Sequence, residues 1–138
     1  MREVEVILQR LAAERVIFIT DTCFSGATTG RTFTTGARRA AVSEAFLARL
    51  TNAKGRVVMA ASRANEVSAE FSNLRHGVFT HFLLEGLRGK ADLDGDKVIT
   101  IDEIYNYVSQ KVPAATNQNQ HPVKRGEVEG QLILGRVQ

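Results

Sequence analysis

The only cysteine of the chain stands where a parallel sheet could expose a nucleophile. Cys23 lies four residues beyond the apolar run Val16–Ile19. In open α/β sheets, ligands bind just outside the carboxyl ends of the strands, so a thiol there could attack a bound substrate. A free thiol is only a few per cent ionised at neutral pH and needs a neighbouring histidine to become the attacking thiolate. The alternative is that Cys23 is a small buried hydrophobic residue.

A second group of chemically active residues lies in the acidic segment 92–103. This segment fits the template of an EF-hand loop, in which oxygen ligands hold a calcium ion. The ligands would be Asp92, Asp94, Asp96, the Val98 carbonyl, Thr100 and Glu103. The template fails at Lys97, which replaces the glycine of the sharp turn and adds a positive charge. The alternative is a solvated acidic turn in which Thr100 caps the following helix.

The spacing of apolar residues predicts the elements that must position these groups. Helices are expected over residues 3–14, 42–54, 77–88 and 101–112. Buried strands are expected over 16–19 and 56–62, with a short last strand over 131–134. Residues 25–40 are rich in Gly and Thr and predict a long mobile loop. Alternating helices and strands indicate an α/β sandwich around a mostly parallel sheet, and so few strands indicate part of a larger unit.

Composition and charge exclude several classes of protein. A chain of 138 residues with 43% hydrophobic and 24% charged residues is one soluble globular domain. The longest apolar runs are too short to span a membrane, and the N-terminus lacks the apolar stretch of a signal peptide. A net charge of +3 without a basic cluster gives no support for nucleic-acid binding. One cysteine cannot form an internal disulfide, which favours the reducing cytoplasm.

Three segments of the chain are similar to one family. Asp21–Gly26 resembles the nucleophile motif of the metacaspases and bacterial caspase-like cysteine peptidases, Asp-x-Cys-(aromatic or His)-Ser-Gly. Val57–Ser62 with Asn65–Glu70 resembles the next core strand and the substrate-binding loop of that family, and His76–Gly89 resembles its next helix. The segments occur in the family's order. The resemblance implies that residues 1–138 are the carboxyl-terminal part of a caspase-like α/β/α sandwich whose upstream strands are absent.

The resemblance also implies an activity that needs no cofactor. Cys23 would be the nucleophile of an endopeptidase that cleaves peptides and proteins after Arg or Lys. Asp21 would line the pocket for the basic side chain, because a carboxylate pairs with a guanidinium and repels an acidic residue. Glu70 would add a second carboxylate, and Ser62 would contact the substrate backbone. The alternatives are that Asp21 bonds loop amides and that Glu70 is a solvated surface charge.

The sequence departs from the family at the general base. The family supplies its catalytic histidine from a His-Gly segment on a strand upstream of the cysteine, but no histidine precedes Cys23 here. The histidines present, His76, His81 and His121, all lie downstream. We therefore expect this chain by itself to be a fragment or an incomplete, inactive product. A non-catalytic caspase-like interaction module and a calcium-binding module are the alternatives, and the oligomeric state is left open.

Overall fold

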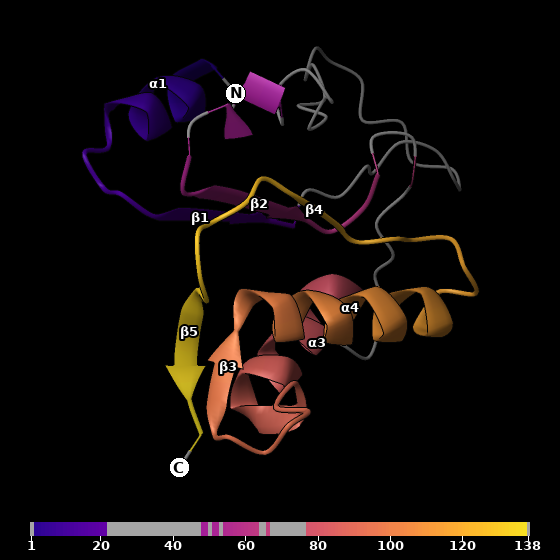
Figure 1. Cartoon of the computed structure of the whole chain (residues 1–138). Coiled ribbons are helices and arrows are strands. Elements are labelled where there is room, and N and C mark those ends of the chain that lie inside the picture. Colours follow the sequence, from indigo (N-terminus) through magenta and orange to yellow (C-terminus); the bar gives the residue numbers. More distant parts are fainter. Residues whose placement is uncertain are drawn as a thin grey trace, which may run out of the picture.

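A three-stranded sheet forms the centre of the fold. The computed structural model describes residues 2–21, 48–49, 51–52, 54–63, 66 and 77–137. The strand order is β1–β2–β4, with bounds Val16–Thr20, Arg56–Ala60 and Val123–Arg125 (Figure 1). β1 and β2 are parallel, with Thr20 opposite Ala60, whereas β4 is antiparallel to β2. The carboxyl ends of β1 and β2 therefore lie at the same edge of the sheet.

Helix α1 (Arg2–Arg10) covers one face of this sheet. Side chains alternate along a strand, so every second residue of β1 and β2 points to the same face. On this face Leu8 packs with Val16, Phe18 and Val58. Of the α1 side chains that the structure describes, only Leu8 is buried, while Ile7 is 61% exposed. The contact is therefore small.

The opposite face carries the main core. It packs against α3 (Val78–Glu85) and α4 (Ile101–Ala115), which lie together across the sheet from α1 (Figure 1). Met59 of β2 and Phe79 of α3 are both fully buried there. Each such side chain contributes roughly 1.5–3 kcal/mol relative to an exposed position. This core fixes α3 against the strand ends.

β1 is less buried than its sequence predicts. A continuous run of β-branched and aromatic residues is typical of a strand covered on both faces, but all five residues of β1 are only half-buried. β2 is buried from Val57 to Ala60. Within the described part of the chain, β2 has a strand on each side and β1 pairs with β2 alone. This edge position explains the difference.

A second sheet joins the acidic loop to the end of the chain. β3 (Val98–Thr100) and β5 (Ile133–Arg136) are antiparallel, and α4 begins directly after β3. The last strand lies two residues later than predicted. Strands β3 and β4 were not predicted, because a run of three residues is too short to show a period. The helix expected over 77–88 is α3, which continues into a π-helical turn, Gly86–Lys90.

The predicted α/β fold class is confirmed, with the β1–β2 pair parallel and antiparallel strands added beside it. The loop predicted over 25–40 lies outside the described residues, as does most of the helix predicted over 42–54, of which residues 48, 49 and 51 are helical. No helix in the described residues is long and apolar enough to cross a membrane.

Candidate functional site

The carboxyl edge of β1 and β2 carries two of the residues that the sequence singles out. Asp21 directly follows β1, and Ser62 lies two residues beyond the end of β2. Both residues are half-buried. Because the two strands are parallel and in register, Asp21 and Ser62 belong to the same edge. Three other residues of interest lie outside the described part of the chain: Cys23, Glu70 and His76.

One oxygen of the Asp21 carboxylate accepts a hydrogen bond, and the other is buried without a partner. Oδ2 accepts a hydrogen bond from the hydroxyl of Thr80 on α3. Oδ1 is buried and has no hydrogen-bond partner among the described residues. Burying a polar atom without a partner costs on the order of 1–3 kcal/mol, so folded proteins seldom do it. A buried carboxylate oxygen that lacks a donor is suited to a cationic ligand that can reach it.

A glycine lets α3 approach Asp21 closely. A Cβ atom at Gly77 would lie 2.8 Å from Asp21 Oδ2, closer than real Cβ contacts allow. Thr80 follows three residues later, on a helix held in the core by the fully buried Val78 and Phe79. Thr80 therefore holds Asp21 from a rigid element. Neither Gly77 nor Thr80 was singled out in the sequence, because helical periodicity identifies core positions but not which polar side chain meets a strand end.

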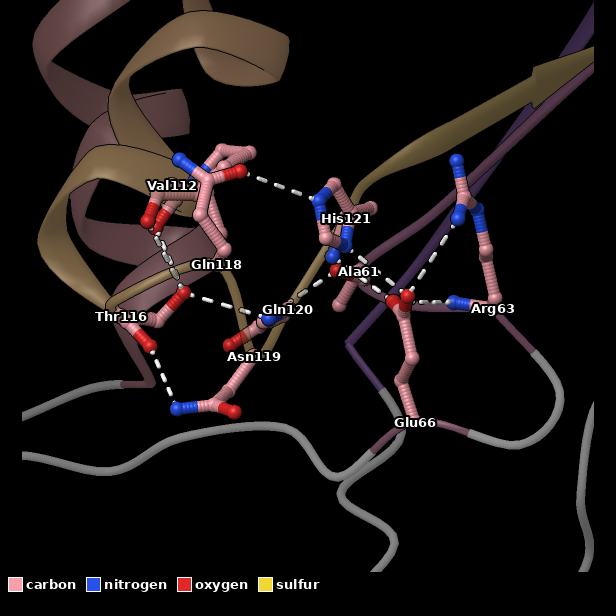
Figure 2. A network of polar contacts seen from close by, with 10 residues as sticks. Ala61, Arg63, Glu66, Val112, Thr116, Gln118, Asn119, Gln120 and His121 are labelled. Atoms are coloured by element: carbon pink, nitrogen blue, oxygen red, sulfur yellow. Dashed lines mark hydrogen bonds and ion pairs between the residues drawn. The ribbon is translucent and has the colours of Figure 1, made fainter.

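A polar network centred on Glu66 lies beside this edge (Figure 2). The Glu66 carboxylate accepts hydrogen bonds from the backbone amides of Arg63 at 3.2 Å and His121 at 2.8 Å. Its Oε1 atom lies 2.9 Å from His121 Nδ1 and 3.7 Å from the guanidinium of Arg63. Burial raises the pKa of Glu66, but the hydrogen bonds from His121 and Arg63 outweigh it and hold that pKa below its ordinary value. Glu66 is therefore an anion at neutral pH.

The network continues into the segment that follows α4. Gln120 is fully buried, and its side-chain Nε2 donates to the carbonyl oxygen of Ala61 at 2.9 Å. The hydroxyl of Thr116 accepts from the backbone amide of Gln120 at 3.2 Å. The sequence motifs include Glu66 only as part of the segment Asn65–Glu70 that resembles the substrate-binding loop, and they assign no role to Gln120 or His121. Glu66 and His121 are 55 residues apart, so no local pattern predicts their pairing.

The acidic loop brings together three of its six predicted ligands. One carboxylate oxygen from each of Asp92, Asp94 and Asp96 lies within 4.8 Å of the others. Lys97, at the template's glycine position, has a φ of 64° and so makes the sharp turn despite its side chain. Its backbone amide donates to Asp92 Oδ2 at 3.1 Å. The loop thus has the turn of the template without the glycine.

The other predicted ligands begin the following elements. Val98 is the first residue of β3. Thr100 and Glu103 form a capping box at the start of α4: the Thr100 hydroxyl accepts from the Glu103 amide at 3.3 Å, and Glu103 Oε2 accepts from the Thr100 amide at 2.9 Å. The predicted helix cap at Thr100 is confirmed, and the structure adds Glu103 as its partner. Binding of calcium stays a prediction.

The sequence matches the family model of the caspase domain over residues 3–130, which is nearly the whole chain. The chain belongs to the caspase-domain family. No curated protein and no solved structure matches it. The predicted resemblance to caspase-like cysteine peptidases is therefore confirmed at the level of the family. A caspase domain is a cysteine peptidase domain, and its substrates are peptides or proteins.

The caspase-domain match leaves the individual roles of Cys23, Asp21, Ser62 and Glu70 as predictions. It also leaves the general base unassigned. Of the two histidines that the structure describes, His121 belongs to the Glu66 network. His81 lies half-buried on α3, where its ring packs edge-on against Phe82 with the ring centroids 5.1 Å apart. That contact gives His81 a packing role.

If the acidic loop of this caspase domain binds calcium, we expect Lys97→Gly to tighten binding by about tenfold or more. The change removes a positive charge that repels the calcium ion at the carboxylates. Isothermal titration with calcium measures the affinity. Asp92→Ala should abolish the heat in either background. No heat at millimolar calcium in both the parent chain and Lys97→Gly would leave the loop with its capping role alone.

Proposed function

We propose that the chain is the carboxyl-terminal part of the catalytic domain of a cysteine endopeptidase that cleaves after Arg or Lys. Cys23 is the nucleophile, and Asp21 recognises the basic side chain. The observation that carries the proposal is the buried, unpartnered Oδ1 of Asp21 at the carboxyl edge of the sheet. Cys23 follows Asp21 by two residues in the sequence.

The state of Asp21 favours a cationic substrate residue over an acidic one. With Oδ2 held by Thr80, the side chain cannot turn away without losing a hydrogen bond. The unpartnered Oδ1 can accept from a guanidinium or an ammonium group, which would supply the missing donor and the opposite charge. An acidic side chain would bring a like charge and no donor. This argument supports Arg and Lys and opposes Asp and Glu.

The bond changes follow from the residue types. A histidine, expected upstream of Cys23, takes the thiol proton, and the thiolate attacks the scissile carbonyl carbon. The oxyanion accepts from the backbone amide of Cys23. The histidine then gives its proton to the leaving amine, which leaves a thioester, and water hydrolyses the thioester to free acid and thiol. Ser62 and Glu70 contribute to substrate binding. No cofactor enters these steps.

We infer that the enzyme works in a reducing compartment, the cytoplasm. A catalytic cysteine must stay reduced to form a thiolate, and a cytosolic thiol pool maintains that state. Cys23 has no second cysteine in this chain with which to form a disulfide.

The test uses two peptidyl chloromethyl ketone probes, which alkylate a thiolate with loss of chloride and differ only in the residue beside the ketone, Arg in one and Asp in the other. In the full-length protein we expect the Arg probe to alkylate Cys23, read as a mass increase on the peptide containing that residue, and the Asp probe to leave it unmodified. Equal labelling by both probes would contradict the assigned specificity. Labelling by neither would favour the non-catalytic interaction module.

A further inference from the structure

Hydrogen bonds from a distant part of the chain hold the residues that follow β2. The Glu66 amide donates to the carbonyl of Arg63 at 3.1 Å, which ties Glu66 to the residue that follows Ser62. We call the three described residues Ser62, Arg63 and Glu66 the post-β2 turn. The carboxylate of Glu66 then reaches His121, with contacts of 2.8 Å to its amide and 2.9 Å to its ring Nδ1 (Figure 2). The backbone amide and the ring of His121 thus both hold the Glu66 carboxylate.

The segment that presents His121 is itself strongly constrained. Asn117 and Gln118 both have left-handed backbones, with φ of 50° and 63°. Such conformations are costly for non-glycine residues and persist only where the surroundings enforce them, which is common at functional sites. Two hydrogen bonds help to enforce them here. The backbone amide of Gln118 donates to the carbonyl of Pro113 at 2.9 Å, and the side-chain amide of Asn119 donates to the carbonyl of Thr116 at 2.9 Å.

The side chain of His121 is oriented at both ring nitrogens. Nδ1 meets Glu66, and Nε2 lies 3.3 Å from Gln118 Oε1. The next residue but one, Val123, pairs with Ala60 of β2, so the backbone on either side of His121 is fixed beside the strand end. His121 therefore has little freedom to leave Glu66.

We propose that His121 is a positioning residue for substrate binding, acting through Glu66 on the post-β2 turn. This inference rests on the proposed peptidase function, in which Ser62 of that turn contacts the substrate backbone. A loosened turn would weaken substrate binding in the ground state and the transition state alike. Such a change raises KM and leaves kcat nearly unaltered.

The first measurement is steady-state kinetics of the full-length protein on an Arg peptide. His121→Ala should raise KM by about tenfold, the effect expected for losing a hydrogen bond to a charged group, with kcat within about twofold. His121→Asn should recover KM to within about twofold, because its side-chain amide can donate from nearly the position of Nδ1. Lys124→Ala is the matched control. Lys124 lies three residues after His121 and pairs with Asp102, so the change removes a nearby ion pair, and KM should not change.

The second measurement needs no activity. Hydrogen exchange of the Arg63 amide, which also donates to Glu66, should become at least about tenfold faster in His121→Ala and return toward the parent rate in His121→Asn. An unchanged KM in His121→Ala would overturn the inference, and so would a fall in kcat with KM unaltered, which indicates a direct part in the chemistry. If the parent protein cleaves no basic peptide, the proposed function fails, and an unchanged exchange rate in His121→Ala would then overturn the positioning role separately.

Discussion

Asp21→Asn should lower kcat/KM for peptides with Arg before the scissile bond by about 100-fold to 1,000-fold. Removing one partner of a buried charge pair typically costs 2–5 kcal/mol, and every 1.4 kcal/mol is a factor of ten. Asparagine has nearly the shape of aspartate, and its side-chain oxygen can still accept from Thr80. The loss therefore reports the charge that faces the substrate. The measurement is kcat/KM of the full-length protein and its variant on one Arg peptide.

Two further variants separate recognition from folding. Asp102→Asn makes the same chemical change at an exposed carboxylate that is paired with Lys124, and kcat/KM should stay within about twofold. Thr80→Val removes the hydroxyl that holds Asp21, and it should cost about tenfold, whereas Thr80→Ser keeps the hydroxyl and most of the activity. If Asp21→Asn behaved like Asp102→Asn, Asp21 would be a structural carboxylate and the assigned specificity would be wrong.

Cys23→Ala should reduce turnover by about 10⁴-fold or more, which is the scale of loss when a catalytic nucleophile is removed. Without the sulfur no thioester forms, and the remaining groups can only bind the substrate. The measurement is product release from an Arg peptide over hours at high enzyme concentration. The melting temperature of the variant should stay within a few degrees of the parent, because the change is small in volume.

A serine at the same position provides the stricter control. Cys23→Ser replaces the thiol with a hydroxyl of similar size, yet serine is a far weaker nucleophile without a histidine arranged for it, so the variant should be nearly as inactive as Cys23→Ala. Turnover of either variant within tenfold of the parent would show that another residue attacks the peptide bond.

The elements of the main core could be predicted from the sequence because their signals are local. Val57–Ala60 is a continuous apolar run and forms the buried strand β2, and the spacing of Val78, Phe79 and Phe82 gives α3. β4 could not be predicted in the same way. Its residues Val123–Arg125 have no strand-like pattern, and it exists because the chain returns to pair with β2.

In the candidate site too, a local motif predicts one residue, whereas its contacts depend on the tertiary structure. Asp21 could be predicted because it sits in a motif after a strand, but no local pattern indicates that Thr80 holds one of its oxygens and that the other is buried without a partner. The pairing of Glu66 with His121 also depends on tertiary contacts. At Lys97 the sequence argued against the sharp turn, yet the surrounding carboxylates bind the backbone amides and the residue adopts the left-handed conformation.

The most direct test of the account is the ratio of kcat/KM for two peptides that are identical except for Arg or Asp before the scissile bond. Both are measured with the same preparation of full-length protein. If Asp21 recognises the substrate, the Arg peptide should be preferred by about 1,000-fold or more, since the Asp peptide loses a charge pair and gains a like-charge contact. A ratio near one, or a preference for Asp, would contradict the central claim.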